Sequence, residues 1–91
     1  MFKVTVKPDD GEPFEIEVTT RDGLKWERSR KGRSISDFST NPTIEALYSL
    51  TYVAVQRDGR FPGDIRDFED QCDLERHPEG PDGVGPTRMV P

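Results

Sequence analysis

The sequence has little of several features on which common protein classes depend. One cysteine, Cys72, among 91 residues excludes an internal disulfide, and with one histidine, His77, it excludes an ordinary structural zinc site. Only 31% of the residues are hydrophobic, and no apolar run approaches the roughly 18 residues of a membrane span. The N-terminal residues show no stretch typical of a signal peptide. We therefore expect a small soluble protein with a thin core, located in the cytoplasm (the host cytoplasm if it is viral).

Residues that carry chemistry are also scarce. The acidic residues between 64 and 75 lack the spacing of a calcium-binding loop, and no glycine pattern resembles a phosphate-binding loop. Cys72 lies at an apolar position of a predicted helix, where a small buried side chain is expected. His77 lies at the start of a predicted flexible tail, where nothing would position it for catalysis. We therefore expect no catalytic residue, no cofactor and no metal ion, and we do not expect an enzyme.

Apolar and polar side chains alternate in residues 2–19, on both sides of a turn-rich segment at 8–13. This pattern predicts a β-hairpin with one buried face. Within it, Lys3 is expected opposite Glu17 and Lys7 opposite Glu15. Because two strands alone are not stable, helices must cover the apolar face.

Three helices are predicted after the hairpin. The first spans about 21–30, with Leu24 as its main apolar anchor and Trp26 beside it, the second 42–58, and the third 64–72. We expect one core to combine the hairpin face with Leu24, Ile44, Leu47, Val55, Ile65 and Phe68.

The remaining segments are predicted to be irregular. Residues 34–40 are expected to connect two helices, with Ile35 and Phe38 pointing inward. Proline and glycine predominate from residue 75 onward, which predicts a flexible tail at 75–91. The predicted fold is therefore α+β: an N-terminal β-hairpin packed on two or three helices in one domain of residues 1–74, followed by the tail.

The second predicted helix is apolar around most of its circumference. A chain this short can hardly surround such a helix, so Leu50 and Val53 are expected to be partly exposed in an isolated monomer. This pattern predicts a surface for a protein partner or for a second copy of the chain. Its residues are Ala46, Leu50, Tyr52, Val53 and Phe61.

A basic run accompanies the first predicted helix and consists of Lys25, Arg28, Arg30, Lys31 and Arg33. One interpretation is a solvated helix end with salt bridges to the acidic third helix, since positive charge suits a helix C-terminus. The alternative is a contact with an anionic partner such as nucleic acid, with Trp26 stacked on a base instead of buried in the core. We favour the first interpretation, because the net charge of −5 argues against nucleic-acid binding by the whole molecule.

Two stretches resemble small tail-assembly proteins of actinobacteriophages. The first is TTRDGLKWER at 19–28, which is similar to a T-x-R-D-x-x-x-W-E helix that follows a short hairpin in that family. The second is IEALYSLTYVAVQRDG at 44–59, which looks like the family's apolar L-x-x-L-x-Y-x-A-x-x-R-x-G helix. In that family an acidic helix with an aromatic residue follows, here DIRDF at 64–68. The resemblance spans roughly residues 2–74, and the polar segment at 34–40 departs from it by its few aromatic residues.

The resemblance implies a tail assembly chaperone, which keeps the apolar, helical tape-measure protein soluble while tail-tube subunits polymerise around it. In many phages such a gene also yields a longer, frameshifted form. Two other functions fit the same residues. One is a virion structural or connector subunit that uses the apolar strip as a permanent interface. The other is a small phage regulator or host-defence inhibitor that contacts nucleic acid or a nucleic-acid-binding protein.

Overall fold

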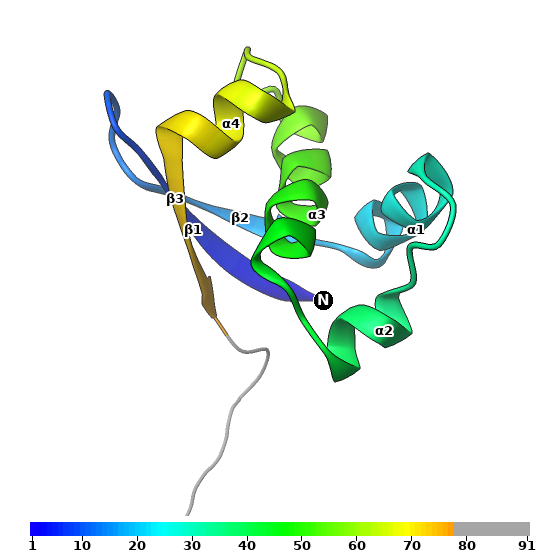
Figure 1. The fold of residues 1–91 in the computed structure, drawn as a ribbon. Coiled ribbons are helices and arrows are strands. Elements are labelled where there is room, and N and C mark those ends of the chain that lie inside the picture. Colours follow the sequence, from blue (N-terminus) through cyan, green and yellow to red (C-terminus); the bar gives the residue numbers. More distant parts are fainter. Residues whose placement is uncertain (78–91) are drawn as a thin grey trace, which may run out of the picture.

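A three-stranded antiparallel sheet and four helices make up residues 1–77, the part of the chain that the computed structural model describes (Figure 1). The strands are β1 (Phe2–Pro8), β2 (Phe14–Val18) and β3 (Cys72–His77), in the spatial order β2-β1-β3. The helices are α1 (Thr20–Ser29), α2 (Ile35–Thr40), α3 (Ile44–Arg57) and α4 (Ile65–Gln71). The predicted α+β fold with an N-terminal hairpin is confirmed.

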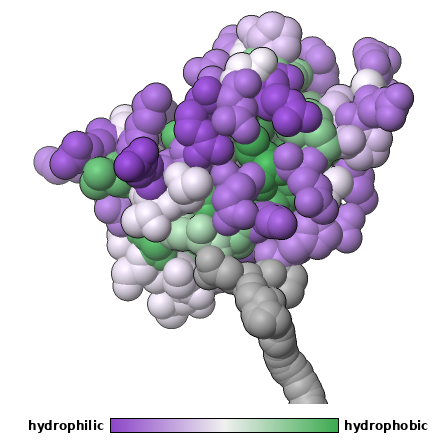
Figure 2. Space-filling view, turned by 180° about the vertical axis from the view of Figure 1, so that it is seen from behind, coloured by the Kyte–Doolittle hydropathy of each residue, from purple (hydrophilic) through white to green (hydrophobic). Residues whose placement is uncertain are grey.

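The core lies between the sheet and the helices. Alternation along β1 and β2 buries one side of the hairpin, namely Phe2, Val4, Val6, Ile16 and Val18. Helix α3 packs on β2 and is flanked by α1 and α4. Seen from behind, the surface is mainly hydrophilic, with small hydrophobic areas between the polar side chains (Figure 2).

The hairpin register differs from the prediction in one pair. Thr5, not Lys7, lies opposite Glu15. Lys3 lies opposite Glu17, as predicted, and because this register places Thr5 opposite Glu15, the predicted pairing of Lys7 with Glu15 is wrong. Lys7 instead forms an ion pair of 2.9 Å with Glu75 of β3. The hydrogen bond from Lys7, and then its positive charge, lower the pKa of the Glu75 carboxyl group.

Strand β3 corrects the predicted start of the tail. Residues 75–77, assigned to the tail by their composition, pair with β1 in the sheet. His77 is likewise part of the sheet, and its Nε2 atom lies 2.7 Å from the hydroxyl of Thr5. The rest of the predicted tail, 78–91, lies outside the described residues.

An arginine explains why the third strand escaped prediction. On the inner side of β3, Cys72 is buried and Leu74 is partly buried, but the next inward position holds Arg76. The Arg76 guanidinium lies over the rings of Phe2 and Phe38, 4.6 and 5.0 Å from their centroids. Because a charged side chain occupies this position, the apolar alternation is too short to predict a strand.

Helix α1 is turned differently from the prediction. Asp22, Gly23 and Trp26 are buried, whereas Leu24 is 47% exposed. Leu24 is therefore not the main apolar anchor and is not part of the core. The rotation of α1 is set instead by the indole of Trp26 and by an ion pair between Asp22 and Arg57 of α3.

The other predicted core residues differ in their burial. Val55 and Phe68 are fully buried, while Leu47 and Ile65 are partly buried and pack against the core. Ile44 is 71% exposed, so its assignment to the core is wrong. The reason is that α3 begins only at this residue, and its first two residues are solvent-exposed.

The segment predicted to be an irregular connection contains α2. Ser34 is its N-cap and accepts a hydrogen bond from the backbone N–H of Asp37. Phe38 is buried and stacks on Phe2, with 5.9 Å between ring centroids, and Ile35 is partly buried, so the inward direction of both is confirmed. A helix of six residues is too short to show a helical period.

Candidate functional site

The apolar strip predicted on α3 is covered by the chain itself. Leu50 is fully buried, and Ala46 and Val53 are partly buried and pack against the core. Helices α1 and α4 and strand β2 all contact α3. The predicted partial exposure of Leu50 is therefore wrong, because these three elements surround the helix more completely than the composition suggested, whereas Val53 is partly exposed, as predicted.

The two aromatic residues assigned to the same strip take part in internal packing. The hydroxyl of Tyr52 donates a hydrogen bond of 2.8 Å to the carbonyl of Gly63 and accepts one of 2.7 Å from Gln56. Burial raises the pKa of this hydroxyl, in keeping with its role as a donor. The rings of Tyr52 and Phe61 lie 5.6 and 5.5 Å from that of Phe68. Their main contacts are thus within the molecule.

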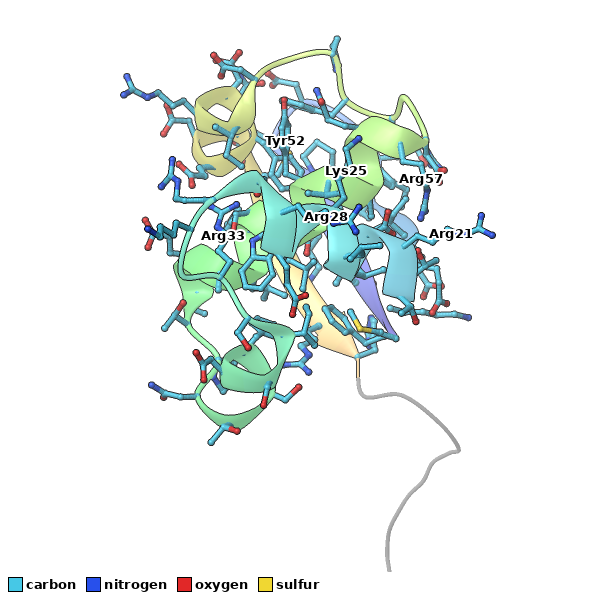
Figure 3. The ribbon with its side chains drawn as sticks, turned by 90° about the vertical axis from the view of Figure 1, so that its right-hand side faces the viewer. Arg21, Lys25, Arg28, Arg33, Tyr52 and Arg57 are labelled. Atoms are coloured by element: carbon cyan, nitrogen blue, oxygen red, sulfur yellow. The ribbon has the colours of Figure 1, made fainter. Side chains whose placement is uncertain are left out.

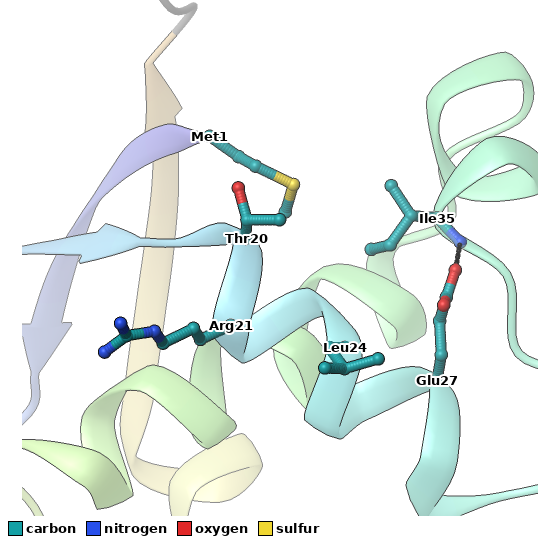
Figure 4. A pocket seen from close by; sticks show the side chains of 6 residues that line it. All are labelled: Met1, Thr20, Arg21, Leu24, Glu27 and Ile35. Atoms are coloured by element: carbon teal, nitrogen blue, oxygen red, sulfur yellow. Dashed lines mark hydrogen bonds between the residues drawn. The ribbon is translucent and has the colours of Figure 1, made fainter.

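A different apolar surface is open. A groove of about 330 Å³ lies where the N-terminal residue, α1 and α2 meet (Figure 4). Its apolar side chains are Met1, Leu24 and Ile35, and Thr20, Arg21 and Glu27 complete the lining. Leu24, the misassigned core residue, is the most exposed of the three apolar side chains. An exposed leucine beside a concave apolar surface is typical of a site that receives a side chain from another molecule.

The close approach of α1 to its neighbours creates this groove. A Cβ atom on Gly23 would lie 3.2 Å from both Met1 Cε and Ile35 Cδ1, so a larger side chain there would crowd both. The carboxylate of Glu27 accepts a hydrogen bond of 2.8 Å from the backbone N–H of Ile35, which ties the start of α2 to α1. The glycine that weakens α1 as an isolated helix therefore lets α1 lie close to Met1 and Ile35, two residues of the groove.

A capping box and an ion pair fix the N-terminal end of α1. Thr19 and Asp22 each accept a hydrogen bond from the backbone N–H of the other. The carboxylate of Asp22 is 3% exposed and is paired with the guanidinium of Arg57. Arg57 also donates to the carbonyl of Glu17 at 3.2 Å, so one side chain joins α3, β2 and α1.

Basic side chains line the exposed side of α1. Arg21, Lys25 and Arg28 are exposed and follow one another at intervals of four and three residues, which places them on one helix face (Figure 3). Arg57 lies near the start of the same helix. No ion pair within residues 1–77 joins the basic run to α4, so the predicted salt bridges to the acidic helix do not form there.

The C-terminal part of the basic run has a different environment. Arg30 and Lys31 are exposed after the end of α1, whereas Arg33 folds back over Trp26, 5.4 Å from the ring centroid. Partial burial and the charge of Arg30 lower the pKa of Arg33. The indole of Trp26 donates a hydrogen bond of 2.9 Å to Ser49, and the side chain is 4% exposed. Trp26 is thus a core residue and not a stacking platform.

Cys72 and the acidic residues are other groups in residues 1–77 that could react or bind a metal ion. Cys72 is buried, and its burial raises the pKa of its thiol, which opposes formation of a nucleophilic thiolate. Within the described part of the chain, no three His, Cys, Asp or Glu residues are grouped so that they could hold a metal ion. No helix found between residues 1 and 77 has the length and apolar character needed to cross a bilayer.

Sequence reasoning missed Met1, Arg21 and Ile35 as site residues and misassigned Leu24. One signal was available: Arg21, Lys25 and Arg28 share a helix face with Leu24, which is unusual for a helix anchored by that leucine. No local sequence pattern predicts that Met1 and Ile35 line the same groove, because this depends on how α2 folds back toward α1.

No protein family matches this chain, and no curated protein or solved structure matches it either.

Proposed function

We propose that this protein is a protein-binding module of the tail-assembly chaperone type, which holds an apolar helical segment of a tape-measure protein in the groove between α1 and α2. The observation that carries the proposal is the exposed Leu24 at the rim of an apolar groove formed with Met1 and Ile35. The resemblance of residues 19–28 and 44–59 to tail-assembly proteins supports the choice of partner.

The groove has the chemistry of a helix-binding site. Helical partners insert apolar side chains into such grooves, and each side chain that becomes buried contributes about 1.5–3 kcal/mol. The free protein leaves about half of Leu24 in contact with water, so a bound helix gains further by covering it. This groove is a different surface from the strip on α3 that the sequence indicated. We prefer the groove because Leu50 of that strip is fully buried and the other strip residues are partly buried against the core.

Co-expression with the tape-measure protein from the same phage tests the proposal. We expect the wild-type protein to keep the tape-measure protein in the soluble fraction and to co-purify with it. Leu24→Glu should abolish both effects while the protein stays folded, since a charge in the groove opposes burial of the partner.

Ile44→Glu provides the matched control. Ile44 is also an exposed apolar residue on a helix, but it does not line the groove. If Ile44→Glu disrupts binding as strongly as Leu24→Glu, or if the wild-type protein leaves the tape-measure protein insoluble, the proposal is wrong. Recovery of the protein from purified particles would indicate a virion subunit instead.

A further inference from the structure

The groove borders a surface of one charge. Arg21 lines the groove, and Lys25 and Arg28 continue from it along the exposed face of α1. Figure 3 shows these three side chains on the same side of the molecule as Arg57. Leu24 lies within this basic face, so an occupant of the groove also meets several positive charges.

The positive charge is concentrated in one segment. Residues 21–33 contain six basic and two acidic side chains, a net charge of +4 in a chain whose net charge is −5. Both acidic groups have partners: Asp22 pairs with Arg57, and Glu27 accepts the backbone N–H of Ile35. The exposed face of α1 therefore presents cations that these carboxylates do not cover.

Two kinds of anionic partner fit a basic face, and the apolar groove distinguishes them. A nucleic-acid site uses exposed aromatic rings for base stacking, but Trp26 is buried with its N–H bonded to Ser49. An exposed leucine and an apolar groove contribute nothing to phosphate contacts. Both features contribute to binding of a protein helix.

We propose that the groove accepts an amphipathic helix in which Asp and Glu residues flank an apolar stripe. The stripe packs on Met1, Leu24 and Ile35, and the acidic flank faces Lys25 and Arg28. Glu27 lies on the α2 side of the groove and would repel acidic residues, so the acidic flank lies on the α1 side only. This inference rests on the proposed function and specifies which segments of the partner bind.

Synthetic helices test the inference with the full-length protein. The first peptide carries leucines at helical spacing with Glu on one flank, the second replaces each Glu with Lys, and the third keeps Glu but replaces each Leu with Gln. In a fluorescence anisotropy titration, we expect the Leu/Glu peptide to bind at least about tenfold more tightly than either of the other two. Added salt should weaken its binding.

Charge reversal locates the contact. Lys25→Glu with Arg28→Glu should weaken binding of the Leu/Glu peptide about tenfold and strengthen binding of the Leu/Lys peptide. The matched control is Lys3→Glu with Arg66→Glu, which changes the net charge equally at exposed positions on β1 and α4. We expect the control to change binding less than about threefold, and circular dichroism to show both variants folded.

Other results would overturn the inference. If the Leu/Glu and Leu/Lys peptides bind equally well and Leu24→Glu abolishes binding of both, the apolar groove is the binding site. The inference that the partner carries an acidic flank is then wrong. An oligonucleotide that displaces the Leu/Glu peptide and binds Leu24→Glu equally well would assign the basic face to nucleic acid. If the protein self-associates and the variant Lys25→Glu with Arg28→Glu does not, the basic face binds a second copy of the chain. Co-expression with the tape-measure protein tests the proposed function independently of these peptide titrations.

Discussion

Two leucines provide a direct test of which apolar surface is core and which is open. Leu50 is fully buried, whereas Leu24 is 47% exposed beside the groove. Leu50→Ala removes a complete side chain from the core and leaves a cavity, which costs about 2.7–5 kcal/mol. Leu24→Ala removes the same side-chain atoms, but only about half of their transfer free energy is lost because the side chain is half exposed. The change leaves no enclosed cavity, and alanine has a higher helix propensity than leucine. We therefore expect the free energy of unfolding to fall by about 1 kcal/mol or less.

Urea unfolding measures this difference. Trp26 is the one tryptophan and is 4% exposed, so its fluorescence reports the loss of the core. With a slope of about 1 kcal/mol per M urea for so small a domain, the two midpoints should differ by at least about 2 M. Leu50→Val serves as a milder core variant if Leu50→Ala unfolds in buffer. Equal midpoints for the two alanine variants would refute the assignment of Leu50 to the core and Leu24 to the open groove.

Three further predictions concern the stability of the domain. The hydroxyl of Thr51 is buried without a hydrogen-bond partner, so Thr51→Val should stabilise the protein by about 1 kcal/mol, and a lower melting temperature would contradict this. Arg57→Ala leaves the buried carboxylate of Asp22 with fewer donors and should cost about 2–3 kcal/mol in urea unfolding. Unchanged stability of that variant would show that the ion pair does not hold α1 and α3 together. Removal of residues 78–91 should leave the melting temperature unchanged. Removal of residues 75–91 should lower it by several degrees, because part of β3 is lost. Equal melting temperatures for the two truncated proteins would contradict a stabilising role of β3.

The hairpin could be predicted from the sequence because its period of two is unbroken over both strands and a turn-rich segment separates them. Strand β3 could not, since Arg76 occupies an inward position and its guanidinium lies over aromatic rings where an apolar residue would be expected. Its pairing partner is also far away in the sequence, as shown by the register of Lys3 with His77.

The candidate site was harder to predict than the fold. Local pattern favoured Leu24 as the anchor of α1, but the helix is turned by the ion pair of the buried Asp22 with Arg57 and by the close approach of Gly23 to Ile35. Both contacts join distant parts of the chain. The basic character of the face was readable from composition, whereas the groove beside it depends on α2, which is too short to show a period.

Covalent capture of the partner tests most directly whether the groove holds an apolar helix. A photoreactive phenylalanine analogue can replace Leu24 in one variant and Ile44 in another, and each is illuminated after co-expression with the tape-measure protein. We predict that the analogue at position 24 crosslinks to a helical segment of the tape-measure protein and that the analogue at position 44 does not. Crosslinking at position 44 but not at 24 would contradict the account.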